Sequence, residues 1–247
     1  MAGRLGAVSR TLTMRLLEGA AAAAFVGLPF GLLLALVAYG WDPLHRLDRR
    51  AAEAATAWVR RHPTLLDALD LVAVVFAPRT FYICAGVAAL WLFARGIRRV
   101  AAWIVVTAAA GSLLGVLTKL AVERARPLIE DPIARAPGFS FPSGHALNSA
   151  LGCAILLLAF LPLLHGWRRG AACAAALTIT LVTGADRVLL GVHYISDVIA
   201  GWALAGAMVA GTATAFSLWR REHGWLPSRP QTGMEPEMES ELSHSGH

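Results

Sequence analysis

A histidine and an aspartate stand close together in the stretch GVHYISDVIAG, residues 191–201. His193 and Asp197 are four residues apart, so on a helix their side chains share one face. A carboxylate hydrogen-bonded to one imidazole nitrogen fixes the tautomer and leaves the other nitrogen free as a nucleophile. Arg187, shortly before this pair, adds a cation. The alternative interpretation is a structural His–Asp pair that closes a short loop.

A second polar run, FSFPSGHALNSA, covers residues 139–150. Ser143 is a favoured N-cap residue, and Gly144 lets the backbone come close to a ligand. A helix N-terminus with free N–H groups binds phosphate readily, and His145 would stand in its first turn. For this run alone, an ordinary N-cap followed by an incidental histidine is the simpler interpretation.

The third run is KLAVERARP, residues 119–127. Lys119 and Arg126 are two helical turns apart and share a face if the helix continues to Arg126, where Pro127 would stop it. The alternative is an ordinary membrane span that ends in basic side chains reaching the interface.

The three runs together indicate phosphoryl chemistry. Cationic side chains and backbone donors suit a transferring phosphoryl group, and two histidines offer a nucleophile and a general acid. No cluster of Asp and Glu indicates a bound metal, so we expect no metal and no cofactor.

The elements that must position these residues are membrane spans. Of 247 residues, 57% are hydrophobic and 15% are charged, and the mean hydropathy is +0.58. Soluble domains carry about 25% charged residues, and a spanning helix needs roughly 20 apolar ones. Six apolar runs satisfy this length, at about 17–40, 71–94, 98–120, 144–164, 170–190 and 194–219. We predict one membrane-embedded domain over 1–225 and a disordered tail over 226–247, rich in Pro, Ser, Gly and Glu.

Three details of this layout need an interpretation. The first run is longer than the apolar core of a secretory signal, so we interpret it as a retained span. The second run carries Pro78 and Arg79 and could begin only after them. The three cysteines fall inside predicted spans without metal-binding spacing and are interpreted as small apolar side chains.

Basic residues indicate the orientation. They cluster before the first predicted span, between spans two and three, between four and five, and after span six, and the net charge is +6. The positive-inside rule then predicts cytoplasmic termini and places the 3–4 and 5–6 connections, with all three runs, on the extracytoplasmic side. This charge pattern does not point to nucleic acid. The extracytoplasmic side also holds basic residues. Some of them lie on a predicted amphipathic interfacial helix at about 45–62 that includes Trp58.

The order of the three runs resembles the PAP2 family, the type 2 phosphatidic acid phosphatases and lipid phosphate phosphatases, whose superfamily includes the vanadium haloperoxidases. The pattern K-x6-RP, then PSGH, then R-x5-H-x3-D is matched by ten residues: Lys119, Arg126, Pro127, Pro142, Ser143, Gly144, His145, Arg187, His193 and Asp197. One departure is Asp186, which stands where the family usually has a serine before the third-motif arginine.

The resemblance implies an all-α, six-span, PAP2/haloperoxidase-like helical bundle that acts on a lipid phosphate within the bilayer. It implies that His193 attacks phosphorus to form a phosphohistidine, that Asp197 holds its ring, and that His145 protonates the leaving oxygen. The implied phosphate-binding residues are Lys119, Arg126, Ser143, Gly144 and Arg187. Undecaprenyl diphosphate, phosphatidic acid and phosphatidylglycerol phosphate are all candidate substrates, and the oligomeric state stays open.

Two other classes of protein remain as alternatives. A lipid transporter or flippase would explain six spans but not two histidines, an aspartate and three cations on one face, and neither inverted repeats nor broken helices are visible. A phosphotransferase could use the same pocket and would differ only in its acceptor. A haloperoxidase using the same pocket is expected to be soluble, so the six predicted spans argue against this activity.

Overall fold

The computed structural model describes residue 24 and residues 27–129 and 132–222 of the chain. The described part is helical and contains no strand. After a helix over Gly27–Ala38, the elements are α2 (Asp42–Arg60), α3 (Leu66–Val75), α4 (Pro78–Ala94), α5 (Arg98–Val122), α6 (Gly144–Phe160), α7 (Trp167–Leu189) and α8 (Ile195–Glu222), with short 3₁₀ turns at Pro63–Leu65 and Leu161–Leu163. The prediction of an all-α multi-pass membrane protein is confirmed.

Five helical segments of the described chain are long and apolar enough to cross a membrane, at Pro63–Ala94, Arg98–Val122, Gly144–Leu163, Trp167–Leu189 and Ile195–Ser217. The last four agree closely with the predicted spans. The first begins earlier than the predicted 71–94 and is interrupted between α3 and α4. Ala77 is extended because it precedes Pro78, which cannot continue the helix before it and instead starts α4.

The predicted first span, 17–40, lies partly outside the described residues. Its described portion is the helix Gly27–Ala38, which meets α2 at 96°. The predicted tail over 226–247 lies wholly outside the described residues.

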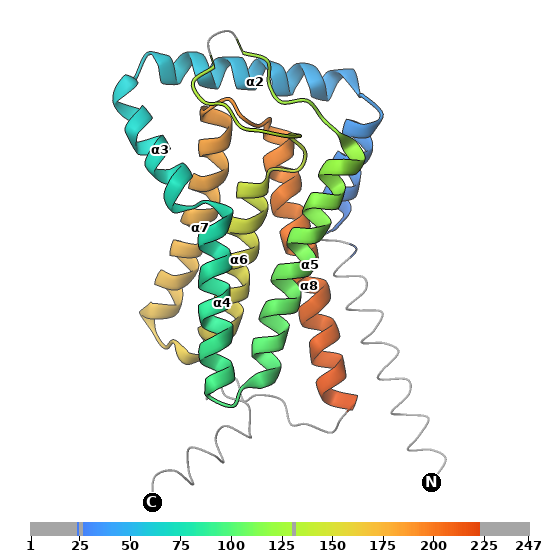
Figure 1. Cartoon of the computed structure of the whole chain (residues 1–247), viewed down its shortest axis with the longest axis vertical. Helices are drawn as coiled ribbons and strands as arrows, with labels where there is room; N and C mark the ends of the chain where they lie inside the picture. The colour runs from blue at the N-terminus through green and yellow to red at the C-terminus, as the bar shows by residue number, and fades with distance from the viewer. Residues whose placement is uncertain (1–23, 25–26, 130–131, 223–247) are drawn as a thin grey trace, which may run out of the picture.

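The predicted interfacial helix is confirmed as an amphipathic helix, α2. Its buried residues, Asp48, Ala52, Thr56 and Val59, recur every three to four positions and therefore form one face. Trp58, on another face, is exposed. Figure 1 shows α2 lying across one end of the bundle formed by α4 through α8. This is the placement expected of a helix that rests on a membrane surface.

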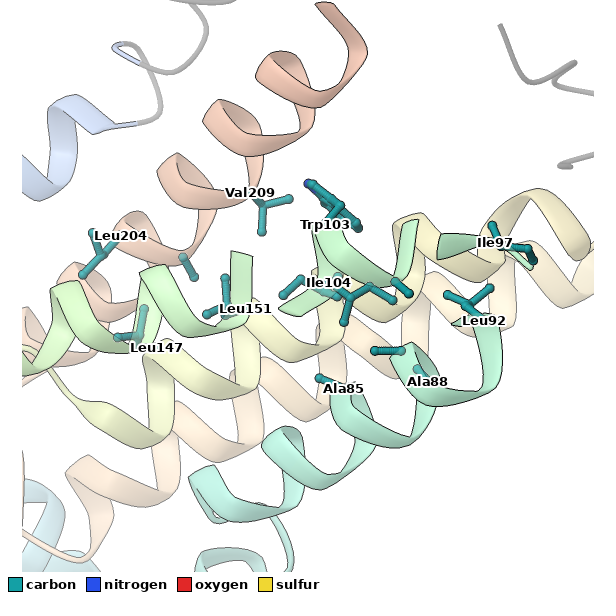
Figure 2. Close-up of a cluster of buried hydrophobic side chains, with 14 residues drawn as sticks. Ala85, Ala88, Leu92, Ile97, Trp103, Ile104, Leu147, Leu151, Leu204 and Val209 are labelled. Carbon is teal, nitrogen blue, oxygen red and sulfur yellow. The ribbon is translucent and has the colours of Figure 1, made fainter. Parts of the chain in front are cut away.

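The bundle is held by apolar contacts among α4, α5, α6 and α8. Figure 2 shows the core, where Ile104, Leu147 and Leu151 are almost fully buried. Gly111 and Gly115 face this core on α5, where an added Cβ would lie 2.7 Å from a Leu151 methyl carbon and 2.4 Å from a Leu147 methyl carbon. Small residues at such positions let neighbouring membrane helices approach closely.

The topology brings four helix ends to one place. α5 and α7 end, and α6 and α8 begin, at the end of the bundle that α2 covers (Figure 1). The α4–α5 and α6–α7 connections lie at the other end. All three sequence motifs therefore meet beneath α2.

Candidate active site

His193 lies in the α7–α8 connection and is 3% exposed. Its Nδ1 faces Asp197 Oδ2 at 3.4 Å, and its Nε2 lies 3.1 Å from Nη1 of Arg126. A guanidinium can only donate, so Nε2 is the acceptor and carries no hydrogen. The hydrogen of the neutral ring is then on Nδ1, which donates to Asp197. The free lone pair of His193 thus points toward a cation.

Burial is the main reason that the pKa of His193 is lowered from 6.5 to about 4. Asp197 opposes this change, and the nearby Arg126 and Lys119 add to it. At neutral pH the ring is therefore uncharged and can act as a nucleophile.

Arg126 is fixed by backbone carbonyl groups. It donates to the oxygens of Gly138 and Pro137, both at 2.9 Å, and of Val192 at 2.8 Å. The third span does not continue to Arg126, which was the condition for Lys119 and Arg126 to share a helical face. The helix ends at Val122, because Glu123 adopts a left-handed conformation and redirects the chain.

Lys119 is in the last turn of α5, and its Nζ donates to the carbonyl oxygen of Phe139 at 2.9 Å. It stands within electrostatic range of both Arg126 and Asp197. The two cations of the first motif therefore reach the same site from a helix end and from a loop, not from one helical face.

The second motif forms the N-terminus of α6. Ser143 caps the helix as predicted, since its Oγ accepts from the N–H of Ala146 at 3.4 Å. The backbone N–H of Ser143 donates to the carbonyl of Asp197 at 3.0 Å and ties this turn to α8. A Cβ on Gly201 of α8 would lie 2.9 Å from the Ser143 carbonyl oxygen, so only glycine fits there. A Cβ on Gly144 would meet nothing within 4 Å, which leaves open space beside the helix N-terminus.

His145 follows in the first turn of α6. Its Nε2 lies 3.3 Å from the carbonyl oxygen of Ala73, which can only accept, so Nε2 carries a hydrogen. The other nitrogen, Nδ1, is then the one available for proton transfer. Arg187, His193 and Arg126 are all within electrostatic range of His145.

Arg187 is buried near the end of α7 and pairs with its neighbour Asp186. Both Nε and Nη2 of Arg187 donate to Asp186 Oδ2, the former at 2.8 Å. Asp186 Oδ1 is buried and has no hydrogen-bond partner among the described residues. The residue that departs from the family pattern thus occupies two donors of a predicted phosphate-binding arginine.

Sequence reasoning missed two buried residues of this region, Arg124 and Asp48. Arg124 Nη1 lies 2.6 Å from Asp197 Oδ1, and its Nη2 lies 2.7 Å from Asp48 Oδ2. Asn148 was also missed: its amide donates to the Gly144 carbonyl at 2.8 Å and accepts from the Ser112 hydroxyl. One indication of Arg124 was present in the sequence, namely that it is a second arginine within the K-x6-RP motif.

Side chains that could ligate a metal do not gather in the described part of the chain. No group of three or more His, Cys, Asp or Glu residues has a suitable arrangement there. Cys84, Cys153 and Cys173 are free and lie on α4, α6 and α7. The site offers cations and N–H donors, which suit an anionic phosphoryl group.

Two sequence comparisons find similar proteins. The model of the PAP2 superfamily matches residues 100–221, which include all three motifs. Phosphatidylglycerophosphatase B of Bacillus subtilis (strain 168) is 37% identical over 95 residues, which cover 37% of this chain and 46% of that protein. The chain thus aligns with less than half of that relative's length.

The fold is also that of a solved relative. The crystal structure of a transmembrane PAP2-type phosphatidylglycerolphosphate phosphatase from Bacillus subtilis has a TM-score of 0.66 and 24% identity, and the match covers 84% of this chain and 99% of that one. The superfamily's model lies across all three motifs, and the helices around them are arranged as in that solved structure, so the chain resembles the PAP2 superfamily in its motifs and in its fold.

Proposed function

We propose that the chain is an integral membrane phosphatase that releases phosphate from a membrane lipid through a phosphohistidine. The observation that carries this proposal is the orientation of His193. Its Nδ1 faces a buried carboxylate, and its unprotonated Nε2 faces Arg126 at 3.1 Å. A lone pair aimed at a cationic pocket is what attack on a bound phosphoryl group requires.

In the first step, the Nε2 lone pair forms a P–N bond while the P–O bond to the lipid breaks. Arg126 then donates to a phosphate oxygen in place of Nε2. The phosphorylated ring becomes cationic with its hydrogen on Nδ1, and Asp197 stabilises that charge. His145, protonated on both ring nitrogens when the substrate is bound, gives its Nδ1 proton to the leaving lipid oxygen and becomes neutral, while its Nε2–H stays on the Ala73 carbonyl.

In the second step, a water molecule attacks phosphorus and His145 accepts one of its protons. The P–N bond breaks, its electron pair returns to Nε2, and inorganic phosphate leaves. The proposed phosphate-binding groups are the cations of Lys119, Arg126 and Arg187, the hydroxyl of Ser143 and the N–H of Gly144. No step needs a metal, because these donors balance the phosphoryl charge.

Phosphatidylglycerophosphate is the proposed lipid. The support is the similarity to phosphatidylglycerophosphatase B of Bacillus subtilis. α2 and its N-cap residue carry the exposed side chains of Trp41, Leu47 and Trp58, which suit a site that opens at headgroup level.

A substrate panel tests this proposal. Purified protein in detergent is given phosphatidylglycerophosphate, phosphatidic acid or undecaprenyl diphosphate, and phosphate release is measured. We expect the highest kcat/KM for phosphatidylglycerophosphate. Preference for another lipid would change the substrate, whereas no release from any of them would contradict the phosphatase.

We further propose that the site faces the extracytoplasmic side and that both termini are cytoplasmic. Exposed Arg95, Arg98, Arg168 and Arg169 lie in or beside the connections at the opposite end of the bundle, which favours a cytoplasmic location for that end. The net charge and the membrane setting give no support to a nucleic-acid partner.

Cysteine labelling tests the orientation. In a background without native cysteines, Arg135→Cys marks the site end and Arg168→Cys marks the other end, and both positions are exposed. A membrane-impermeant thiol reagent on intact cells should label position 135 and leave 168 unlabelled. The reverse pattern would place the site in the cytoplasm.

A further inference from the structure

A buried chain of ion pairs joins the surface helix α2 to the His193–Asp197 pair. Asp48 lies on α2, and Arg124 lies just past the end of α5. Arg124 bridges two carboxylates, with Nη2 at 2.7 Å from Asp48 and Nη1 at 2.6 Å from Asp197. Asp48, Arg124 and Asp197 are 1%, 7% and 0% exposed.

Arg124 occupies the oxygen of Asp197 that His193 does not use. Asp197 Oδ2 accepts from the backbone N–H of Tyr194 at 2.9 Å and faces Nδ1 of His193, while Oδ1 accepts from Arg124. The Arg124 guanidinium also lies 4.2 Å from the centre of the Tyr194 ring. Because both oxygens are held, the carboxylate keeps one orientation toward the histidine.

Asp48 holds Arg124 from the other side and also holds the start of α8. Its Oδ1 accepts from the backbone N–H of Ser196 at 3.1 Å, and its Oδ2 accepts from Arg124 and the Ser196 hydroxyl. α2 touches the α7–α8 connection again at Gly191, where φ is +70° and an added Cβ would lie 2.6 Å from a methyl carbon of Thr56. The segment that carries His193 is therefore supported by α2 on both sides.

Stability alone does not explain three buried charges at this point. Replacing a buried ion pair by apolar residues of similar volume is often neutral or stabilising, because the charges lose their hydration. Two carboxylates and one guanidinium leave one net negative charge beside His193. That charge can stabilise the cationic ring formed when the histidine is phosphorylated.

We infer that Asp48 and Arg124 are positioning residues that orient Asp197, and through it His193, so that the surface helix α2 supports the reacting histidine. The inference rests on the proposed function. Neither residue is assigned a contact with the phosphate. They act through Asp197.

The charges of Asp48 and Arg124 act on His193 together with the other charged and titratable groups around the ring. Lys119 of α5, Arg126 of the α5–α6 connection, His145 of α6 and Asp197 of α8 lie within electrostatic range of the ring, and Arg187 of α7 lies within range of His145 and Arg126. Asp48 and Arg124 add one negative and one positive charge beyond Asp197.

The test uses the full chain in detergent with phosphatidylglycerophosphate micelles. The variants are Asp48→Asn, Arg124→Gln, Arg124→Lys and the double variant Asp48→Asn/Arg124→Gln. Matched controls are Asp42→Asn and Arg50→Gln, since both side chains are exposed on the same helix. Gel filtration and thermal unfolding measure how much of each variant is folded.

For folded Asp48→Asn and Arg124→Gln we expect kcat to fall by about 10- to 100-fold, as for outer partners of metal-binding histidines. KM should stay within about threefold, because neither residue binds substrate. Arg124→Lys should recover part of kcat. The double variant should lose less than the product of the single losses, because both residues act through the same contact with Asp197 and Asp48 has no guanidinium left to hold once Arg124 is replaced.

The acid limb of the pH profile of kcat/KM distinguishes a positioning role of Asp48 from a purely structural role. Asp48→Asn removes a negative charge, so His193 binds a proton less readily and the acid limb moves to lower pH than in the wild type. A residue that only holds the fold together changes the yield of folded protein and leaves this limb in place.

The outcomes distinguish the two proposals. A wild type that releases no phosphate from any lipid overturns the proposed function and this inference together. An active wild type with both single variants within about twofold in kcat, or with losses in KM alone, overturns only the inference. If Arg124→Gln does not fold, Asp48→Asn and Arg124→Lys decide by the same criteria.

Discussion

The two ends of the helical bundle use their charged residues in opposite ways. Beneath α2, charged and titratable side chains are buried and paired with one another: Asp48, Arg124, Asp186, Arg187, His193 and Asp197. At the other end, Arg95, Arg98, Arg168 and Arg169 are exposed.

The exposed arginines make contacts of a weaker kind. Arg95 and Arg98 lie 5.1 Å and 5.4 Å from the ring centres of Trp91 and Phe93. Such contacts at exposed sites contribute little, whereas removing one partner of a buried ion pair costs about 3–5 kcal/mol. Burial and pairing, more than residue type, should therefore decide what a substitution does to this molecule.

Replacing one histidine at each end of the bundle should give the largest difference in phosphate release between two variants. His193→Ala removes the attacking nitrogen, and we expect kcat to fall by about 10⁴-fold or more, as when a triad nucleophile or base is removed. His165→Ala, at an exposed histidine of the α6–α7 connection, should keep wild-type turnover. Phosphate release from equal amounts of folded protein measures both. A folded His193→Ala variant with near-wild-type release would contradict the phosphohistidine.

Replacing one arginine at each end of the bundle should give the next largest difference, here in kcat/KM. Arg126→Gln removes a donor to the phosphoryl group, for which we expect a loss of about 10²- to 10³-fold in kcat/KM. Arg98→Gln at the opposite end is the matched control and should have little effect.

The same Arg126→Gln variant should change the pH profile. Arg126 is one cause of the lowered pKa of His193, about 4, so removing the positive charge raises this pKa. Nε2 is then protonated at a higher pH, and the acid limb of kcat/KM moves upward. Because substrate ionisation is the same for both enzymes, the difference belongs to the protein. An acid limb that does not move would argue against contact between Arg126 and His193.

A smaller effect is expected at Asp186. Its carboxylate holds two donors of Arg187, so Asp186→Ser should free them for phosphate and lower KM by roughly 3- to 10-fold, since one hydrogen bond contributes about 1 kcal/mol net. Asp67→Ser, at an exposed carboxylate of α3, is the control. Steady-state kinetics with phosphatidylglycerophosphate measure KM. A higher KM in Asp186→Ser would mean that Asp186 orients Arg187 for binding and does not compete with the phosphate.

The smallest effect should come from chelation. Cations of the protein surround the proposed phosphate position, so EDTA should leave phosphate release unchanged. Orthovanadate should inhibit by occupying the same position. If EDTA abolishes release and Mg²⁺ restores it, the metal-free mechanism is wrong.

Local sequence was enough to predict the four spans from Arg98 onward. The four spans from Arg98 onward lie within about three residues of their predicted limits, because apolar runs of this length have few other structures available in a bilayer. The amphipathic period also revealed α2. The span before Arg98 was misjudged, since its first half, α3, contains Asp67 and Asp70 and the extended Ala77 interrupts the helix.

The support around the site could not be predicted in the same way. Arg124 and Asp48 are 76 positions apart, and each resembles an ordinary charged residue near a membrane surface. Their burial depends on α2 folding back across the bundle at 96° to the helix before it. The left-handed Glu123 that turns Arg124 inward also has no signal in its own residue type.

The number of residues in the turn between α7 and α8 is fixed by its backbone hydrogen bonds. The backbone N–H groups of Val192 and His193 both donate to the carbonyl of Arg187 at 3.2 Å, and Gly191 donates to Val188. An inserted residue would break this closed ring of bonds and rotate the histidine away from its partners. The spacing between Arg187 and His193 should therefore tolerate neither an insertion nor a deletion.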